Sequence, residues 1–316
     1  MHDVFVSRLT HEAQGVLGIE LRAADGGALP TFTAGAHVDV HLPGGLCRQY
    51  SLTNGPAQAD RYCLGVGLAP DSRGGSREVH ERLRAGDRLQ VSAPRPLFGL
   101  ALEAPEHVFV AGGIGITPIL SMIEACQATG QHWRLLYCVR SRARAAYLWR
   151  LAAHYPRVQV HVDEEQEALA DVAGFLQSIP HMAHVYCCGP APLMDAVGRE
   201  AASAGLPPHA VHFERFAADG AAADAAADRA FRVTLRRQGA SYLVPAGRSI
   251  LETLEENGIA LPCACREGLC RTCETPLLAG RADHRDFVLT EQERAANTSI
   301  IPCVSRALDD ELVLDL

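Results

Sequence analysis

Four cysteines near the end of the sequence have a spacing that could hold an iron–sulfur cluster. Cys265, Cys270 and Cys273 follow the pattern C-x4-C-x2-C, and Cys303 lies 30 residues further on. This is the plant-type [2Fe–2S] ligand pattern, in which three thiolates come from one loop and the fourth from a distant segment. Zinc or purely structural thiols are the alternative, but zinc sites usually use paired C-x2-C units, and the sequence has a single such unit.

The segments around these cysteines have clear helix signals. Ser249 with Glu252, and Thr290 with Glu293, match the capping box that opens an α-helix. The first box starts a helix expected within 248–258, and the second starts a short helix before Cys303. Strands are expected at Phe231–Arg236 and Ser241–Val244. Together these elements indicate an α+β ferredoxin domain of the β-grasp type over residues 230–316.

A glycine-rich turn in the middle of the chain could hold a pyrophosphate. It runs from Gly112 to Pro118, after a strand-like stretch and before a helical one. Backbone N–H groups of such a turn can approach a phosphate closely. We expect Thr117 to cap the following helix and Gly130 to end it. Pro118 stands where the strict G-x-G-x-x-G pattern has its third glycine, so the turn alone is a weak signal.

The surroundings of this turn alternate between strand and helix signals. This alternation predicts a doubly wound α/β domain with a parallel sheet over residues 103–216. A second turn, Cys188-Gly189-Pro190, also follows a strand, and ligands bind beyond the carboxyl ends of strands in such sheets. The expected strands are His107–Ala111, Arg134–Val139, Val158–Val162, His184–Cys188 and Ala210–Phe213.

Residues 1–102 show short strands separated by turn residues, which predicts a small antiparallel β-barrel. One helical stretch, Ser76–Arg84, starts directly after Gly74-Gly75, and a Gly-Gly-Ser turn into a helix is a candidate phosphate cradle. The expected strands are Val4–Leu9, Val16–Arg22, His37–Leu42, Arg48–Leu52, Arg61–Val66 and Arg88–Val91.

Composition limits the class of protein. The chain has 316 residues, 48% of them hydrophobic, and a formal net charge of −8, all 29 cationic residues being arginine. The negative charge argues against a nucleic-acid partner. No apolar run reaches the roughly 18–20 residues that span a membrane, and the first residues lack a signal-peptide pattern. We therefore expect a cytoplasmic protein in which the cysteines bind metal or stay reduced.

The order of these motifs resembles the phthalate dioxygenase reductase family, which includes vanillate O-demethylase reductases, within the ferredoxin–NADP reductase superfamily. The resemblance covers essentially the whole chain in the order flavin, NAD, ferredoxin, with residues 217–229 as a linker. It rests on the R-x-Y-S-like segment Arg48–Thr53, the two glycine turns, the cysteine loop, and the segments Arg73–Ser76, Asp283–Asp286 and Cys303–Ala307.

The resemblance implies FMN, NADH and a [2Fe–2S] cluster as cofactors and assigns roles to matching residues. Arg48 would pair with the flavin phosphate, Tyr50 would lie along the flavin ring and Ser51 would reach flavin N5. Cys188 would lie near nicotinamide C4, with Glu214 and Phe216 completing the catalytic set. The Gly-Gly-Ser turn favours FMN over FAD. The other implied flavin-site residues are Leu52, Thr53, Arg73, Gly74, Gly75 and Ser76, and the implied NAD-site residues are Gly112, Gly113, Gly115, Thr117, Cys188, Gly189 and Pro190.

Two features leave alternatives open. Arg271 replaces the glycine that similar ferredoxin loops have between Cys270 and Cys273; it could tune the cluster potential, or point to solvent and meet a partner protein. Several arginines lie in a stretch without acids, where they could bind the 2′-phosphate of NADPH or form a solvated basic face, although the resemblance favours NADH. They are Arg134, Arg140, Arg142, Arg144 and Arg150.

The leading functional hypothesis is the reductase component of a two-component Rieske-type oxygenase in aromatic catabolism. Its protein partner would be the terminal oxygenase, and a monomer suffices because one chain carries all three redox cofactors. The alternative is a self-sufficient NADH reductase of free flavin or ferric iron, but such an enzyme needs no iron–sulfur cluster. A redox sensor would need a DNA-binding or signalling segment, and the sequence offers no candidate.

Overall fold

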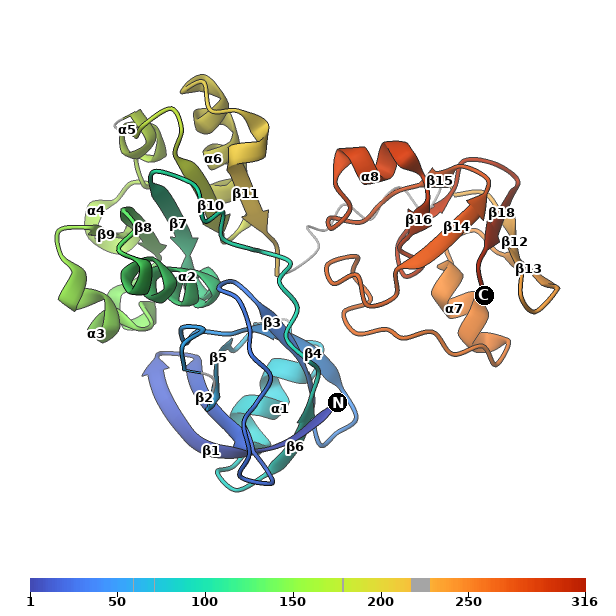
Figure 1. Ribbon diagram of the computed structural model, residues 1–316, viewed down its shortest axis with the longest axis horizontal. Coiled ribbons are helices and arrows are strands. Elements are labelled where there is room, and N and C mark those ends of the chain that lie inside the picture. The colour runs from blue at the N-terminus through green and yellow to red at the C-terminus, as the bar shows by residue number, and fades with distance from the viewer. Residues whose placement is uncertain (59, 71, 178, 217–227) are drawn as a thin grey trace. The chain divides into compact units, whose positions relative to one another are not determined.

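The computed structural model describes residues 1–58, 60–70, 72–177, 179–216 and 228–316. The chain divides into two compact units, Met1–Glu214 and Arg215–Leu316 (Figure 1). The first unit therefore combines the two expected N-terminal domains. Of the expected linker 217–229, residues 217–227 lie outside the described residues.

The N-terminal part of the first unit is an antiparallel six-stranded sheet that curls around one helix, α1 (Gly75–Arg82). The strand order is β4-β3-β6-β1-β2-β5. An isolated antiparallel bridge between Leu52, directly after β4, and Leu64 of β5 connects the two edge strands of the sheet. Alternate residues such as Val4 and Val6 are buried, as expected for a sheet with one face on a core. The strands are β1 (His2–Ala13), β2 (Val16–Ala23), β3 (His37–His41), β4 (Cys47–Ser51), β5 (Tyr62–Gly67) and β6 (Arg88–Val91).

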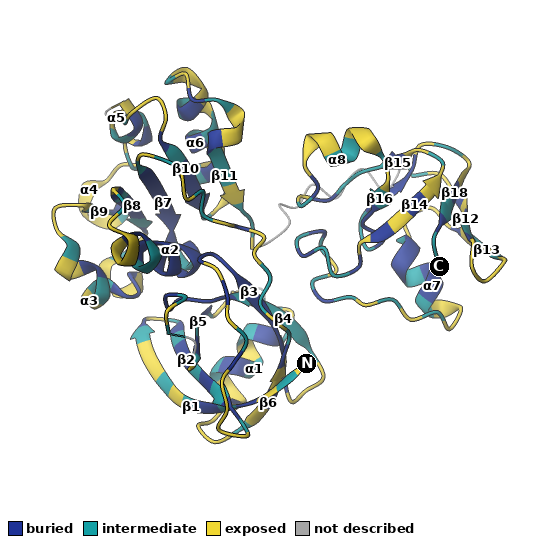
Figure 2. Cartoon of the chain, viewed as in Figure 1, coloured by how far each residue is buried: buried dark blue, intermediate teal, exposed yellow. Residues whose placement is uncertain are grey.

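The rest of the first unit is a parallel sheet with the order β11-β10-β7-β8-β9. Its inner strands β7, β8 and β10 are mostly dark in Figure 2 because both faces are covered, whereas the edge strand β11 is teal and yellow. On β7, Phe109 packs into the cluster that includes α2 and α3, whereas Val108 and Val110 pack on the opposite face with α5 and α6. This is the predicted doubly wound arrangement. The strands are β7 (His107–Gly112), β8 (Trp133–Val139), β9 (Val158–Val162), β10 (His184–Cys188) and β11 (Val211–Glu214).

Helical segments connect these parallel strands. The α-helices are α2 (Ile116–Thr129), α3 (Leu148–Leu151), α4 (Asp163–Gln166), α5 (Val172–Gln177) and α6 (Ala191–Ser203). The 3₁₀ turns are η1 (Gly113–Gly115), η2 (Arg142–Arg144), η3 (Ala152–His154) and η4 (Pro208–Ala210). The prediction that Thr117 caps α2 is wrong, because the 3₁₀ turn η1 comes first and Gly115 takes the cap position. Thr117 lies inside the first turn and donates its hydroxyl to the Ile114 carbonyl at 3.0 Å.

The two sheets of the first unit share one hydrophobic core. Ala34 and Phe98 from the N-terminal part belong to the same buried cluster as Met122 of α2. Gly35 allows this approach: it has φ +79°, and a Cβ at this position would lie 1.9 Å from the Phe98 carbonyl oxygen. The shared core gives the two sheets a fixed relation, on which any site between them depends.

The second unit contains a mixed sheet with the order β13-β12-β18-β14-β16, next to a two-stranded pair, β15 and β17. Strand β18 lies between β12, to which it is parallel, and β14, to which it is antiparallel. Both predicted capping boxes are present, at the starts of α7 and α8. The elements are β12 (Phe231–Leu235), β13 (Ala240–Val244), α7 (Ile250–Glu256), β14 (Thr275–Ala279), β15 (Ala282–Asp283), α8 (Glu291–Ala296), β16 (Ser299–Ile300), β17 (Arg306–Ala307) and β18 (Glu311–Leu314).

None of the helices in the described parts of the chain has the length and apolar character needed to cross a membrane.

Candidate functional site

The predicted phosphate cradle forms where β4 meets the start of α1. Arg48 donates hydrogen bonds to the carbonyls of Cys47 at 2.8 Å and Arg73 at 2.9 Å, which fixes its guanidinium group. A Cβ on Gly75 would lie 2.6 Å from Cγ and Nε of Arg48, so the arginine lies directly against the first turn of α1. A guanidinium group beside free helix N–H groups is a suitable site for a phosphate. These residues therefore fit the phosphate of a flavin mononucleotide.

The other implied flavin-site residues divide into two groups. Tyr50 is half-buried at the end of β4, and burial raises the pKa of its phenol to about 12, so it is a neutral ring. Ser51 is buried. Leu52 and Thr53 lie in the core, where the Thr53 amide donates to the Cys63 carbonyl at 2.8 Å. The remaining members are at the start of α1: Gly74 at the cap position, and Ser76, whose hydroxyl donates to Ser72 Oγ at 2.9 Å.

The two glycine turns of the parallel sheet pack against each other at the carboxyl ends of β7 and β10. A Cβ on Gly115 would lie 2.1 Å from the Cys188 carbonyl oxygen, and a Cβ on Gly112 would lie 2.5 Å from Cδ of Pro190. A Cβ on Gly189 would come within 2.9 Å of the Gly112 nitrogen. The turns can approach this closely because glycine has no side chain. The open backbone fits the pyrophosphate of a dinucleotide.

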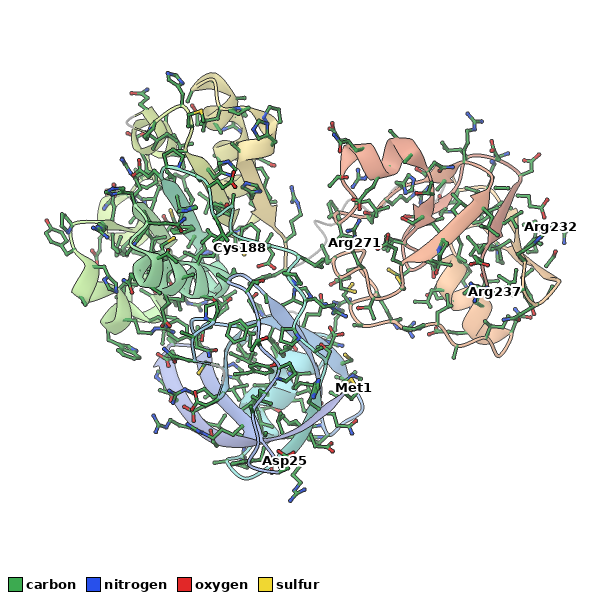
Figure 3. All side chains as sticks on the ribbon, viewed as in Figure 1. Met1, Asp25, Cys188, Arg232, Arg237 and Arg271 are labelled. Atoms are coloured by element: carbon green, nitrogen blue, oxygen red, sulfur yellow. The ribbon has the colours of Figure 1, made fainter. Side chains whose placement is uncertain are left out.

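Three of the predicted catalytic residues meet near these turns. Cys188 and Glu214 are register partners on β10 and β11, and the Ser51 hydroxyl donates to Oε2 of Glu214 at 3.5 Å. Figure 3 shows Cys188 at the end of β10. The fourth predicted residue, Phe216, belongs to the second unit and is exposed.

Burial sets the protonation states in this group. It raises the pKa of the Cys188 thiol well above its usual value, and the nearby Glu214 carboxyl adds to the rise. Residue Glu214 is half-buried as a whole, whereas its carboxyl group is surrounded by protein, and this burial raises its pKa to about 8. Near neutral pH the site therefore contains a neutral thiol and a mostly protonated carboxyl beside a hydroxyl.

The four predicted cluster ligands come together in the second unit. The Cys265 thiol is within hydrogen-bonding distance of the Cys270 and Cys303 thiols, and Cys273 is within that distance of Cys303. Cys265 Sγ also accepts the backbone N–H groups of Glu267 and Leu269, at 3.3 Å and 3.4 Å. N–H···S hydrogen bonds of this kind stabilise thiolates that bind iron.

This arrangement suits a cluster with two irons. Within the described ranges, no three His, Cys, Asp or Glu side chains converge as the ligands of a single metal ion. The four thiols instead neighbour one another in the order Cys270, Cys265, Cys303 and Cys273, and a [2Fe–2S] cluster needs four thiolates, two for each iron. Cys263, the nearest alternative ligand, is half-buried and packs against the same apolar cluster as Cys273 and Cys303.

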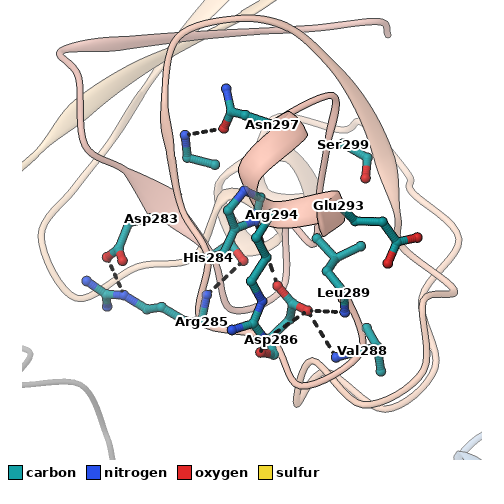
Figure 4. Close-up of polar contacts among 12 residues, drawn as sticks. Asp283, His284, Arg285, Asp286, Val288, Leu289, Glu293, Arg294, Asn297 and Ser299 are labelled. Atoms are coloured by element: carbon teal, nitrogen blue, oxygen red, sulfur yellow. Dashed lines mark hydrogen bonds and ion pairs between the residues drawn. The ribbon is translucent and has the colours of Figure 1, made fainter. Parts of the chain in front are cut away.

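A buried carboxylate organises the segment that packs beneath these ligands. Asp286 is 2% exposed, and its Oδ1 accepts the N–H groups of Val288 at 3.0 Å and Leu289 at 2.7 Å (Figure 4). Leu289 then packs against Cys273 in one buried cluster. The Phe287 amide donates to the Gly268 carbonyl at 3.0 Å, inside the cysteine loop. The segment that the family resemblance marked, Asp283–Asp286, thus supports the ligand loop.

Arg271 is neither an isolated charge beside the sulfurs nor a free side chain in solvent. Its guanidinium group forms an ion pair with Glu293 of α8 and lies 3.3 Å from Glu274. The pair lowers the pKa of the Glu293 carboxyl to about 2. Arg271 has φ +57°, a region that favours glycine, which explains why similar loops have glycine here. The arginine thus compensates two carboxylates next to the ligand loop.

We expect Arg271→Gly to lower the reduction potential of the cluster by a few tens of millivolts, because it leaves two carboxylates uncompensated near the irons. Potentiometric titration followed by electron paramagnetic resonance measures this shift. Arg237→Gly is the matched control, because Arg237 pairs with Asp315 on the β12–β13 side of the same unit (Figure 3). An unchanged potential in Arg271→Gly would end the idea that this residue tunes the cluster.

The arginine-rich stretch of the parallel sheet is partly neutralised. Arg134 pairs with Glu106 at 2.7 Å, Arg142 pairs with Glu165 at 2.7 Å, and Arg150 pairs with Glu124. The structure describes no ion pair for the side chains of Arg140 and Arg144. Three of the five arginines thus have acidic partners far away in sequence, which reduces the positive charge available for a 2′-phosphate.

One contributor to the cysteine site, Arg306, was marked in the sequence only as part of the segment Cys303–Ala307, without a role of its own. Arg306 is 4% exposed and donates to the carbonyls of Arg229 at 2.9 Å and Pro245 at 3.0 Å, which anchors the segment after Cys303. Its partner Asp228, at 3.3 Å, lies at the edge of the described residues. An arginine close after a ligand cysteine was the available signal, but its buried partner was not visible in the sequence.

Comparison with known proteins agrees with this geometry. Residues 233–308 match the family described as 2Fe-2S iron-sulfur cluster binding domain, and residues 94–211 match dimethylamine monooxygenase subunit DmmA-like, N-terminal domain. The chain is 45% identical to vanillate O-demethylase oxidoreductase of Pseudomonas putida over 319 residues, which covers 100% of both chains.

Solved structures of a reductase and of a monooxygenase also resemble this chain over nearly its whole length. Phthalate dioxygenase reductase, described as a modular structure for electron transfer from pyridine nucleotides to [2Fe–2S], matches with a TM-score of 0.75 and 38% identity, covering 99% of this chain and 97% of that one. An intact type IV self-sufficient cytochrome P450 monooxygenase matches with a TM-score of 0.90 and 37% identity. This chain spans 41% of the length of that protein.

Proposed function

The chain belongs to the phthalate dioxygenase reductase family of NADH-dependent oxidoreductases with FMN and a [2Fe–2S] cluster, and from this we propose that it is the reductase component of a two-component Rieske-type oxygenase. The observation that carries the proposal is the presence, in one chain, of a partly buried Ser51–Glu214 pair beside two glycine turns and of four neighbouring thiols. We further propose that NADH is the electron donor and that a monomer is sufficient for activity.

The residues of the first unit would bind and orient the two nucleotides. When bound, FMN accepts a hydride and releases single electrons, which suits a cluster that takes one electron at a time. Arg48 and the first turn of α1 would hold the flavin phosphate. The turns at Gly112–Gly115 and Cys188–Pro190 would hold the dinucleotide, and Ser51 with Glu214 would hold a proton beside the reacting atoms.

The cysteine loop favours a protein acceptor over free small molecules. A reductase of free flavin or ferric iron can work with its flavin alone. A [2Fe–2S] cluster held by the thiols of the second unit would instead pass single electrons to a protein acceptor. The relatives named above are an O-demethylase oxidoreductase and a dioxygenase reductase, which supports an oxygenase as the partner. The similarity to a self-sufficient P450 makes a haem oxygenase the second partner class to test.

An anaerobic titration followed by reconstitution tests the proposal. NADH should bleach both the flavin and the cluster absorbance of the purified protein, and NADPH should do so far less readily. The reduced protein should then reduce the Rieske cluster of a purified aromatic-acid oxygenase. Rapid reduction of free flavin or ferric citrate, with no transfer to the oxygenase, would favour the small-molecule reductase. Transfer only to a ferric P450 would replace the Rieske partner.

The raised pKa of Glu214 predicts a pH dependence. Below about pH 8 its carboxyl is neutral, and above this pH a carboxylate forms beside the flavin position and opposes added negative charge. We expect the rate constant of flavin reduction to fall roughly tenfold from about pH 7 to about pH 9, the effect of a ~1.4 kcal/mol penalty. Stopped-flow absorbance measures this profile, and Glu214→Gln should make it flat.

The same residue affects stability. Its pKa is about 8 in the folded protein and near 4.5 in the unfolded chain, so the folded protein keeps a proton that the unfolded chain releases. The free energy of unfolding should therefore fall as the pH rises between these two values, and Glu214→Gln should reduce that fall. An identical pH profile in the variant would assign the titration to another group.

A further inference from the structure

A partly buried ion pair connects the helix that follows the first glycine turn with the segment that follows Ser51. Glu124 of α2 and Arg150 of α3 form the pair, with side chains 27% and 18% exposed. Arg150 also donates to the Thr53 carbonyl at 2.9 Å. The pair therefore holds the backbone only two residues after Ser51, and it does so from the parallel-sheet part of the first unit.

The carboxylate of Glu124 makes the remaining contacts to this segment. Its Oε2 accepts the backbone N–H of Gly55 at 2.7 Å and the side-chain amide of Gln58 at 3.1 Å. A Cβ on Gly55 would lie 2.6 Å from that oxygen and 2.9 Å from Glu124 Cβ, so a larger residue at this position would displace the Glu124 side chain. Together with Arg150, this carboxylate fixes the segment 53–58 at both of its ends.

The same segment is tied to the barrel on its other side. The Asn54 side chain donates to the carbonyls of Gln58 at 3.0 Å and Arg61 at 3.1 Å, and it accepts the Cys63 amide at 2.9 Å. The segment is thus shared between the two sheets. Its position relative to the barrel is set by Asn54, and its position relative to the parallel sheet is set by the Glu124–Arg150 pair.

Helix α2 connects this pair to the predicted dinucleotide site. The helix starts at Ile116, directly after the turn Gly113–Gly115, and Glu124 lies eight residues further on. Eight residues of α-helix correspond to about 12 Å, and a helix of this length is rigid. Helix α2 therefore links two features. At its start lies the turn proposed to hold the pyrophosphate, and further along it lies the Glu124 carboxylate, which accepts hydrogen bonds from segment 53–58.

A groove lies beside this pair in the first unit. The groove has a volume of about 1180 Å³ and is lined by polar residues such as Arg8 and Gln127, by apolar residues such as Leu120, Ile123 and Leu151, and by the pair itself. The shared apolar core holds the sheets together. At the groove, Glu124 and Arg150 add the polar contacts described above to segment 53–58.

We propose that the Glu124–Arg150 pair is a positioning element that sets the distance between nicotinamide C4 and flavin N5. The inference rests on the proposed function and adds Glu124 and Arg150 to it as positioning residues. Neither residue is among those proposed to bind a cofactor; they act through the backbone after Ser51 and through α2. Because misplacing reacting groups by about 1 Å can cost roughly 100-fold in rate, a small shift of this segment has a large effect.

Glu124→Gln tests the proposal. We expect the rate constant for flavin reduction by NADH to fall by roughly 10- to 100-fold. The long-wavelength charge-transfer absorbance that depends on contact between the two rings should also weaken. FMN content, cluster absorbance and the dissociation constant of NADH should stay within about twofold of the wild-type values, because the groups that bind the cofactors are unchanged.

A readout without cofactors tests the structural link directly. In the cofactor-free protein, amide hydrogen exchange of the peptide that covers residues 52–58 should speed up in Glu124→Gln, because Gly55 loses a charged acceptor. Glu124→Asp keeps the charge but retracts it by one methylene group, so it should be intermediate in rate and in exchange. If Glu124→Gln folds poorly, this second variant carries the test.

Glu106→Gln is the matched control, since it removes the partner of Arg134 just before β7 begins, at the opposite end of the strand from the glycine turns. It should leave the rate and the charge-transfer band unchanged. Equal losses in Glu106→Gln and Glu124→Gln, or a wild-type rate and band in Glu124→Gln, would overturn the positioning role. Failure of NADH to bleach the wild-type protein would instead overturn the proposed function, so the two failures are distinguishable.

Discussion

Replacing Cys303 with serine is expected to abolish the [2Fe–2S] cluster while leaving flavin reduction by NADH intact. Cys303 comes from a different segment than the cysteine loop and is within hydrogen-bonding distance of both Cys265 and Cys273. Without it, one iron loses a thiolate that the loop cannot supply. Flavin reduction should stay near the wild-type rate, because Ser51, Cys188 and Glu214 belong to the first unit. Transfer to an oxygenase should fall below detection.

Iron and sulfide analysis, visible absorbance and electron paramagnetic resonance measure the first effect, and stopped-flow measures the second. Cys263→Ser is the matched control: it removes a half-buried thiol from the same apolar cluster and should keep a full complement of iron. If Cys263→Ser loses the cluster and Cys303→Ser keeps it, the ligand assignment is wrong.

Gly115→Ala is expected to abolish productive NADH binding. The new Cβ would lie 2.1 Å from the Cys188 carbonyl oxygen and 2.5 Å from its carbon, which are backbone atoms that cannot rotate away. Relief requires the two glycine turns to separate, and this moves both the proposed pyrophosphate site and Cys188. We expect kcat/KM for NADH to fall by roughly 100-fold or more, as for other displacements of about 1 Å in an active site.

Gly130→Ala is the control variant. It separates the loss of NADH binding from the general cost of placing alanine where the backbone favours glycine. Gly130 ends α2 with φ +71°, and a Cβ at this position would enter open space, so alanine should cost roughly 1 kcal/mol of stability and leave kcat/KM unchanged. FMN content should stay at the wild-type level in both variants, because neither touches the cradle around Arg48. A wild-type kcat/KM in Gly115→Ala would show that the turns do not hold the dinucleotide.

The elements with strong local signals could be predicted from the sequence. The capping boxes at Ser249 and Thr290 start helices as expected, and the two glycine turns follow buried parallel strands. The exception, Thr117, has a suitable side chain for a cap, but the 3₁₀ turn before it moves the helix start to Ile116. A local rule fails there because the turn preceding the helix decides which residue has the cap conformation.

The pairings within the sites could not be predicted in the same way. Ser51 and Glu214 are 163 residues apart, and Glu124 reaches Gly55 across 69 residues, so only the tertiary fold brings them together. Arg271 shows an intermediate case. Its unusual position was visible in the sequence, and Glu293 was visible as part of a capping box, but their pairing was not. The roles assigned to Tyr50, Phe216 and the other cofactor-site residues remain predictions that the experiments above address.

The position of β18 determines when the second unit can fold during synthesis. This strand lies inside its sheet, between β12 and β14, yet it leaves the ribosome after both of them. The first unit ends at Glu214 and can fold while the rest is still being translated. Cluster assembly must therefore wait until β18 has been made. Translation that ended before Glu311 would leave a chain with a complete first unit and a second unit that lacks an inner strand of its sheet.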